Sequence, residues 1–222
     1  MRLLVGVFVA ICLVDAVACG ARDGLVSPSL PQLGPLSPGG TLIPLDSGTQ
    51  WTYEVLDTIV LSGGKPSTAS GALTMHVLGD TTIRTLRYAI LDGAPNIFGG
   101  EINNPHWYFR NKADGFYAAG FIALLPQSEP FPVALPPDFL TLPYPARVGG
   151  YYDFGVVSVF SIDTLIAVPA GTFHCLGYLS ANGTTRQFVA AGVGLVRQEV
   201  YNDAPGTTYH TIYQLIETTA GR

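Results

Sequence analysis

The sequence predicts an all-β protein whose strands are mainly antiparallel. Only 12% of the 222 residues are charged, whereas the chain contains 26 glycines and 17 prolines. Globular domains carry about 25% charged residues, and a shortage of charge with an excess of Gly and Pro suits short strands and turns. Segments of alternating apolar and polar residues recur, and none keeps a 3.6-residue period for a useful length. We therefore expect about ten strands, in a curved half-barrel sheet or a sandwich.

Residues 1–18 have the pattern of a secretory signal peptide. Arg2 supplies a short positive region, and residues 3–14 form an apolar run that is too short to span a bilayer comfortably. The run is followed by Ala16-Val17-Ala18-Cys19, which places small residues at positions −3 and −1 from the cysteine. A cleaved signal is therefore the better interpretation of this segment.

The same four residues resemble the lipobox of bacterial lipoproteins, although Ala16 stands where that motif usually has Leu. The resemblance implies that Cys19 is lipidated and becomes the first residue of the mature protein. An ordinary signal peptide cleaved after Ala18 would instead leave Cys19 free. If Cys19 is acylated, Cys175 has no disulfide partner, because Cys12 leaves with the signal. Several acyl chains would hold the protein durably to a membrane.

The composition after the signal divides the mature chain into two parts. Residues 19–43 are rich in Pro and Gly and lack a periodic apolar pattern, which predicts a lipid-anchored flexible tether. Residues 44–222 then form a single β-rich domain. The net charge of −5 gives no indication of a basic surface that would bind nucleic acid.

Alternation and turn residues place the first strands. On residues 50–57, Trp51, Tyr53 and Val55 share one face. Gly79-Asp80 is expected to be the turn of a hairpin, and Ala113-Asp114-Gly115 another. The expected strands of this half cover residues 50–57, 70–79, 81–91, 106–112 and 115–123.

Residues 124–147 contain seven prolines among apolar side chains, and a strand ladder does not tolerate so many missing donors. This stretch is expected to be either a lid or a plain link between two halves. Two further turns should rest on Pro169 with Gly171 and on Gly192 with Gly194, since Pro fixes φ and Gly adopts φ > 0. The expected strands of the second half cover residues 151–167, 172–181, 184–191, 195–202 and 207–218.

Two phrases of the sequence recur in the same order. The pattern Pro44-x3-Gly48-x2-Trp51-x-Tyr53-x-Val55 returns 101 residues later as Pro145-x3-Gly149-x2-Tyr152-x-Phe154-x-Val156. The phrase Phe109-x5-Gly115-Phe116-Tyr117 returns 79 residues later as Phe188-x5-Gly194-Leu195-Val196. The repeats suggest two related halves, 44–123 and 145–218, joined by the Pro-rich connection 124–144. Alternatively, a Gly turn before an aromatic strand is simply a common way to begin a strand.

Several motifs together resemble a broad set of uncharacterised bacterial envelope lipoproteins, over residues 44–217. They are Gly48-x2-Trp51-x-Tyr53, Tyr108-Phe109-Arg110 before Asp114-Gly115, Val168-Pro169-Ala170-Gly171-Thr172-Phe173, and Gly192-Val193-Gly194-Leu195-Val196 before Glu199. The resemblance implies a β-rich fold, similar in shape to lipoprotein carriers of the LolA and LolB type. It brings no catalytic residue with it.

The sequence contains no motif for catalysis, metal or cofactor. The four histidines lack metal-ligand spacing, and neither Cys-x-x-Cys nor Gly-x-Ser-x-Gly occurs. His174 adjoins Cys175, but neighbouring strand residues point to opposite faces, so the imidazole does not reach the thiol. We expect no cofactor, no metal site and no enzyme activity, with a hydrolase whose site is invisible in sequence as the third choice of function.

Aromatic residues at alternating positions leave two interpretations open. They fill the core of a sheet, or they line an apolar groove that holds an acyl chain or another apolar ligand. The groove candidates are Trp51, Tyr53, Trp107, Phe109, Tyr117, Tyr152 and Phe154. The leading function is a membrane-anchored, non-catalytic binding or carrier module of the bacterial envelope, facing the periplasm or the outer surface. The alternative is a structural lipoprotein that contacts another envelope protein.

The lipid anchor yields the first testable prediction. Cys19→Ala should release the full-length protein from membranes, because the acyl chains would be its only durable attachment. Fractionation of bacterial cells after a salt wash measures the release. A Cys19→Ala protein that stays in the membrane fraction would contradict the lipoprotein interpretation.

Overall fold

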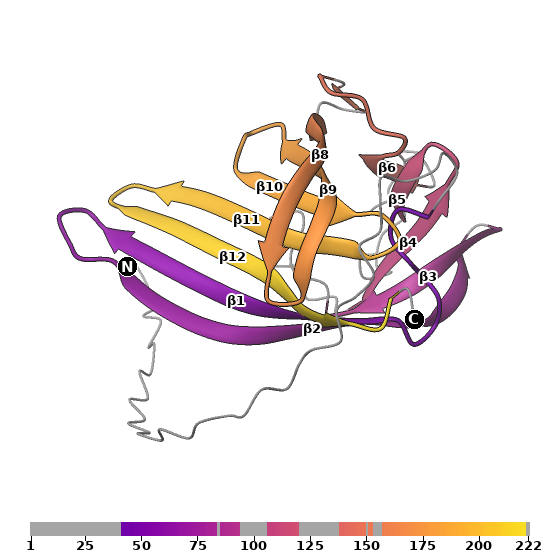
Figure 1. Cartoon of the computed structure of the whole chain (residues 1–222), viewed down its shortest axis with the longest axis horizontal. Helices are drawn as coiled ribbons and strands as arrows, with labels where there is room; N and C mark the ends of the chain where they lie inside the picture. Colours follow the sequence, from indigo (N-terminus) through magenta and orange to yellow (C-terminus); the bar gives the residue numbers. More distant parts are fainter. Residues whose placement is uncertain are drawn as a thin grey trace, which may run out of the picture.

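The computed structural model describes residues 41–83, 85–93, 106–119, 138–149, 151–152 and 157–220. Figure 1 shows how the strands in these ranges follow one another along the chain. They are β1 (Gln50–Leu61), β2 (Ser67–Ile83), β3 (Leu86–Asp92), β4 (His106–Lys112), β5 (Gly115–Ala119), β6 (Asp138–Pro143), β7 (Tyr151–Tyr152), β8 (Val157–Val168), β9 (Gly171–Ser180), β10 (Thr185–Ala190), β11 (Gly194–Ala204) and β12 (Thr207–Thr218). Within those ranges, no helix is long and apolar enough to cross a bilayer.

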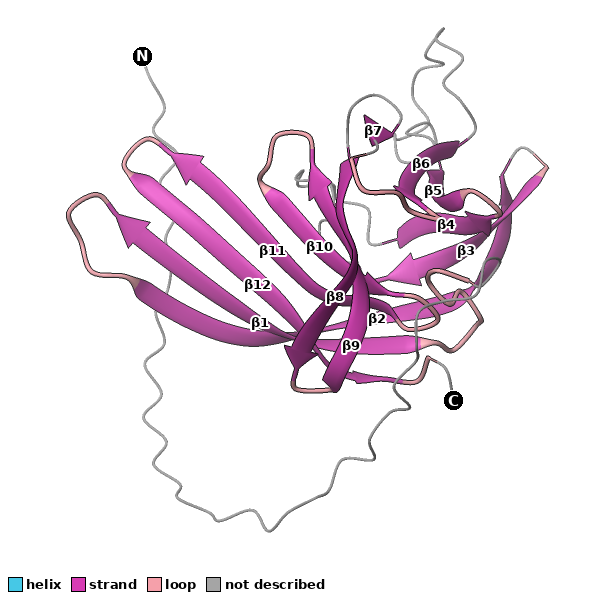
Figure 2. Ribbon diagram, turned by 45° about the horizontal axis from the view of Figure 1, so that its top comes forward, coloured by secondary structure: helices cyan, strands magenta, loops and turns pink. Residues whose placement is uncertain are grey.

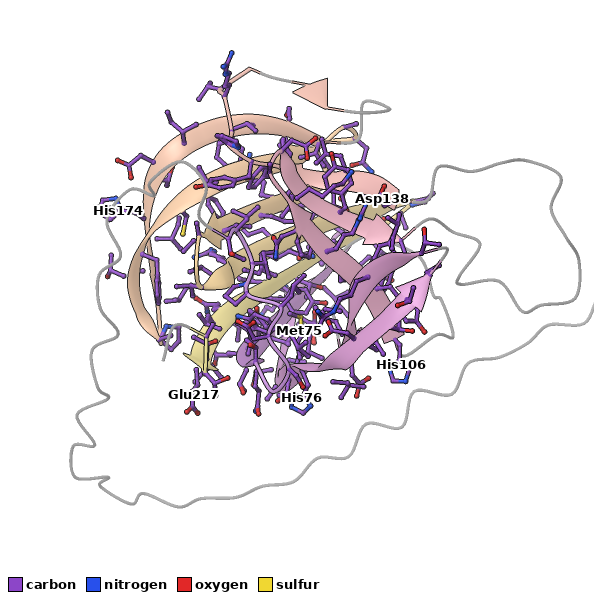
Figure 3. All side chains as sticks on the ribbon, turned by 90° about the vertical axis from the view of Figure 1, so that its right-hand side faces the viewer. Met75, His76, His106, Asp138, His174 and Glu217 are labelled. Carbon is purple, nitrogen blue, oxygen red and sulfur yellow. The ribbon has the colours of Figure 1, made fainter. Side chains whose placement is uncertain are left out.

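All twelve strands belong to one antiparallel sheet, which confirms the predicted fold class (Figure 2). Its order is β6-β5-β4-β3-β2-β1-β12-β11-β10-β9-β8-β7, so each strand lies beside its neighbours in sequence and β12 lies beside β1. The sheet curls until it is nearly closed into a barrel (Figure 3). The Tyr178 hydroxyl of β9 donates to the carbonyl of Pro143 at the end of β6, 3.0 Å away, and so links the two ends of the sheet.

Strand alternation separates an inner face from an outer face. On β1, Trp51 and Tyr53 are buried and lie opposite Met75 and Leu73 of β2. Figure 3 shows Met75 inside the curl and its neighbour His76 on the outer surface. Successive strand residues point to opposite faces, so the odd-numbered residues of β1 and of the first part of β2 share the inner face.

The core fills one end of the curl. Trp51, Tyr53, Phe109 and Leu215 are fully buried there. Burial of such a side chain stabilises the fold by about 1.5–3 kcal/mol. Residues 41–45 enter from the N-terminal side and contribute Leu42 to this core.

Two hydrogen bonds hold this N-terminal segment. The Thr41 carbonyl accepts from the amide of Gly192, 2.9 Å away, between β10 and β11. The Asn111 side-chain amide of β4 donates to the Ile43 carbonyl at 2.8 Å. The segment therefore crosses the interior between two distant parts of the sheet.

The hairpin expected at Gly79-Asp80 is wrong, because β2 runs through both residues. The pairing of β2 with β3 shifts register between Val77 and Gly79, and Gly79 has φ 153°. A glycine inside a strand commonly marks such a bulge, which bends the strand without ending it. Residues 67–76 of β2 pair with β1, whereas residues 76–83 pair with β3. The pairing of β2 thus passes from β1 to β3 close to the bend.

The Pro-rich stretch was not expected to contain a strand, and this prediction is wrong at its end. Residues 138–143 form β6, an edge strand that pairs only with β5 among the described residues. Pro143 is tolerated because it ends a strand at the sheet edge, where fewer ladder bonds are required. The Arg110 guanidinium of β4 donates to the Asp138 carboxylate, with Nε and Oδ2 2.6 Å apart, and fixes the start of β6. Residues 120–137 lie outside the described residues.

The repeated phrases of the sequence fall on corresponding strands. The sheet consists of two six-stranded meanders, β1 to β6 and β7 to β12, which are joined where β1 pairs with β12. The repeated phrases fall on β1 and β7, on β4 and β10, and on β5 and β11. Gly48 and Gly149 have φ of 86° and 80°. Their amides donate to Val77 of β2 at 2.9 Å and to Val159 of β8 at 3.0 Å. The two phrases therefore share a glycine with positive φ and one backbone hydrogen bond, and the interpretation of two related halves stays a prediction.

The glycines expected in turns do have positive φ. Gly171 has φ 138°, Gly192 74° and Gly194 105°. Gly171 follows Pro169 at the tip of the β8–β9 hairpin, which crosses over β12 in Figure 1. There the Ala170 amide donates to the Leu215 carbonyl at 3.0 Å.

Substitution of Gly171 tests this turn. A Cβ at Gly171 would meet only the Phe173 ring, at 3.8 Å, so the cost of Gly171→Val should come from the backbone. A side chain at positive φ costs about 1–3 kcal/mol, which lowers the melting temperature of a domain this size by about 2–12 °C. Thr172→Val, one residue on, is the control and should change it by under about 1 °C. Equal melting temperatures for the two variants would contradict this account of the turn.

Candidate binding site

Two buried aromatic side chains of β1 are fixed by backbone carbonyls. The Trp51 indole Nε1 donates to the Val193 carbonyl at 2.6 Å, and the Tyr53 hydroxyl donates to the Leu195 carbonyl at 3.0 Å. Burial raises the pKa of the Tyr53 phenol, so it remains a donor at any physiological pH. A Cβ on Gly194 would lie 3.0 Å from Trp51 Nε1, and the φ of 105° also disfavours a side chain there, so glycine suits this position. Both side chains belong to the closed core.

The aromatic residues expected to line a groove do not form one surface. Phe109 is fully buried and stacks on Phe116, with ring centroids 4.8 Å apart. Trp107 stacks on Phe109 at 6.3 Å and is only partly buried. Tyr117 lies on the opposite face of the sheet, where Lys112 Nζ is 3.6 Å from its ring centroid. Core packing is thus the observed role of Trp51, Tyr53 and Phe109.

Two further groove candidates cannot be placed. Tyr152 lies in β7, and its side chain is outside the described part of the structure. Phe154 lies outside the described residues altogether. Cys19 and residues 20–40 of the predicted tether also fall outside them. The predicted end of the tether at residue 43 is wrong, because Leu42 and Ile43 are buried in the core.

The inner face continues beyond the core into an open hollow. The paired ends of β1, β2, β11 and β12 extend past the rest of the sheet (Figure 2). The Ser62 amide donates to the Gly206 carbonyl at 2.8 Å and ties the two hairpin ends together. On this extension lies a hollow of about 380 Å³. Its lining residues come from β1, β2 and β12, and are Val55, Asp57, Ala69, Ser70, Gly71, Ala72, Leu73 and Tyr213.

Small residues of β2 make the floor of this hollow. Gly71 lies opposite Val55 in the sheet, and Ala69 lies opposite Asp57. A Cβ added to Gly71 would meet no atom within 4 Å, so the space above it is open. Sequence reasoning missed this site, because small residues carry little periodic signal. The run Ala69-Ser70-Gly71-Ala72 in a strand is the signal that could have indicated it.

A row of side chains crosses five neighbouring strands where the core meets the hollow. The sheet register places Gln187, Gln198, Tyr213, Val55 and Gly71 side by side. Gln198 is fully buried, and its Oε1 accepts a long bond from Gln187 Nε2 at 3.4 Å. The row therefore begins with the buried Gln187 side chain of β10 and ends at Gly71 of β2, where the space above the sheet is open.

One carboxylate lines the hollow. The Thr211 hydroxyl donates to Asp57 Oδ1 at 2.6 Å from the opposite position on β12. The pKa of the Tyr213 phenol is raised, first by burial and second by the negative charge of Asp57. Tyr213 therefore stays neutral at physiological pH.

His174 and Cys175 lie apart from this hollow. His174 Nδ1 is 2.6 Å from Asp163 Oδ1, in a solvent-exposed pair on the outside of the barrel (Figure 3). Cys175 is buried in the core, and this burial raises the pKa of its thiol to about 12. The two side chains point to opposite faces, as alternation predicts. In the described ranges, no group of three or more His, Cys, Asp or Glu side chains is arranged to hold a metal ion.

A second exposed feature is β8, which becomes an edge strand where its pairing with β7 ends. β9 pairs with it along its length, whereas the described residues of β7 pair only with residues 157–158. Phe160, Ile162 and Leu165 are 41%, 54% and 63% exposed. The pairing with β9 also shifts register twice, between Val159 and Thr164, and such bulges discourage pairing with a further strand.

Comparison with known proteins gives structural likenesses only. No protein-family model matches the chain, and no curated protein matches its sequence. A "putative exported protein with YmcC-like fold" from Bacteroides fragilis has a TM-score of 0.44 and 17% identity, over 81% of this chain and 99% of that one. A "putative lipoprotein" from Parabacteroides distasonis has a TM-score of 0.42 and 16% identity, over 81% and 99%. A LolA superfamily protein from Nitrosomonas europaea has a TM-score of 0.21 and 8% identity, over 82% and 89%. At these scores the likenesses carry nothing about ligand or partner.

The structural role of Tyr53 can be tested with a matched pair of substitutions. Tyr53→Phe deletes the buried hydroxyl that bonds Leu195, and should lower the free energy of unfolding by about 1–2 kcal/mol. Tyr209→Phe deletes the same atom at a partly exposed position of β12 and should change it by less than about 0.5 kcal/mol. Urea denaturation measures both. Equal losses would show that the Tyr53 hydroxyl does not hold the curl.

Proposed function

We propose that this protein is a membrane-anchored, non-catalytic binding or carrier module of the bacterial envelope, and that its ligand has an apolar part that lies in the hollow. The observation that carries the proposal is the hollow above Gly71 on the inner face of β1, β2 and β12. A concave site with apolar walls and few polar groups is the usual form of a small-molecule site.

The size and walls of the hollow fit one small ligand. Its volume of about 380 Å³ lies at the lower end of the range of roughly 300–1,000 Å³ for such sites. Val55 and Leu73 supply aliphatic walls, and Tyr213 supplies an aromatic one. A ligand that covers these side chains removes apolar surface from water, which is favourable by about 25 cal/mol per Å² before the costs of association.

The location rests on the N-terminal sequence. The signal-like residues 1–18 and the lipobox-like cysteine at position 19 favour export and lipid anchoring. The tether leads to Thr41, where the hydrogen bond from Gly192 fixes the start of the folded part. A folded module at the end of a Pro-rich and Gly-rich tether would reach ligands near the membrane that holds it.

Interaction with another envelope protein is the second candidate, and the β8 edge favours it. Its three exposed apolar side chains and its short pairing with β7 are features of a protein contact. The register shifts of β8 weigh against strand addition there, so ligand binding in the hollow remains the first proposal.

Filling the hollow tests the proposed function. Gly71→Phe adds a ring on the floor of the hollow, at a position where a Cβ meets no atom within 4 Å. We expect at least a tenfold loss of affinity for decyl maltoside, an uncharged decyl probe used below its critical micelle concentration. Isothermal titration calorimetry on the full chain carrying Cys19→Ala avoids competition from the acyl anchor.

The control for this experiment is Thr68→Phe, an exposed position of the same strand that does not line the hollow. Thr68→Phe adds the same ring outside the hollow, and this variant should bind decyl maltoside with the affinity of the parent protein. If Gly71→Phe binds decyl maltoside as tightly as Thr68→Phe does, the ligand does not occupy the hollow.

A further inference from the structure

Among the residues that the structure describes, Asp57 is the only charged one that lines the hollow. Its hydrogen-bond partner is the neutral Thr211 hydroxyl. No lysine, arginine or histidine in the described part of the chain forms an ion pair with it. Glu54, on the same strand, points to the outer face and bonds Gln214 there. Within the described part of the chain, the hollow therefore contains one negative charge without a counter-cation.

Two tyrosine rings flank this carboxylate. The register of β1 against β12 pairs Asp57 with Thr211, and places Tyr213 and Tyr209 at the next inner-face positions on either side. Diagonal neighbours in an antiparallel pair lie about 7–8 Å apart, which aromatic side chains span. Tyr213 lines the hollow, and Tyr209 is partly exposed beyond it. A carboxylate between aromatic rings is an arrangement that attracts organic cations, because the faces of the rings are electron-rich.

We infer that the ligand of the hollow is an amphipathic organic cation, such as an alkylammonium compound. This inference rests on the proposed function and names its ligand class. The apolar part of the ligand lies over Gly71 against Val55 and Leu73, and its ammonium group lies beside Asp57.

The charge of Asp57 discriminates among the ligand classes. A purely apolar ligand would cover the carboxylate and remove water from it without offering a partner, which is costly. An anionic ligand would add repulsion to that cost. An ammonium group supplies the missing counter-charge and leaves the Thr211 hydroxyl bond in place.

Three probes that share one decyl chain test the inference: decyltrimethylammonium, decyl maltoside and decyl sulfate, each below its critical micelle concentration. Calorimetry on the full chain carrying Cys19→Ala should rank the ammonium first and the sulfate last. Asp57→Asn keeps the shape of the side chain. It should lower the affinity for decyltrimethylammonium about fivefold and should not lower the affinity for decyl maltoside.

The matched control is Asp203→Asn, which removes one exposed carboxylate from the same extension, outside the hollow. It changes the net charge equally and should leave all three affinities unchanged. The inference is overturned if the ammonium shows no preference, or if Asp57→Asn weakens all probes alike. If decyl maltoside still binds in either case, the proposed function survives. If no probe binds the parent protein, both fail.

Discussion

Two hydrogen bonds from the inner face of β1 hold the curl of this sheet. Trp51 and Tyr53 reach past β12 to the carbonyls of Val193 and Leu195, at the start of β11. Because those donors and acceptors are buried, the loss of either partner would leave a polar group desolvated. The φ of Gly194 and its lack of a side chain allow the indole to approach the backbone closely. The large side chains are therefore committed to one end of the barrel. The open space is left at the other end, where β2 has Gly71 and two alanines.

Much of the fold is readable from the sequence because its signals are local. Alternation and Gly turns place the strands from β9 to β12 within one or two residues of their observed bounds. The hairpin turn predicted at Gly79 is wrong because a glycine can form either a tight turn or a bulge within a strand. Which of the two forms depends on the partner strand, and β3 pairs across the bulge. The edge strand β6 was missed for a related reason, because a proline is excluded from a ladder only where its missing donor is needed.

The candidate site was much less predictable than the fold. The alternating aromatic residues were candidates for the lining of an apolar groove, yet Trp51, Tyr53 and Phe109 are buried in the core. The hollow exists because β2 has no side chain at Gly71. It also depends on the register that places the lining residues of β1 beside those of β2 and β12. Register is a long-range property: Asp57 and Thr211 lie 154 residues apart in the sequence and are joined by a hydrogen bond. No local pattern shows that Asp57 lies between two tyrosines.

The most direct test of this account is a crystal structure of the protein with a bromine-terminated decylammonium ion. The anomalous signal of bromine would locate the apolar end of the ligand, and density would locate the ammonium group. The account predicts the ammonium group within hydrogen-bond distance of the Asp57 carboxylate, the chain above Gly71 and the bromine beside Leu73. A ligand bound along β8 or on the outer face, with the hollow occupied only by water, would contradict it.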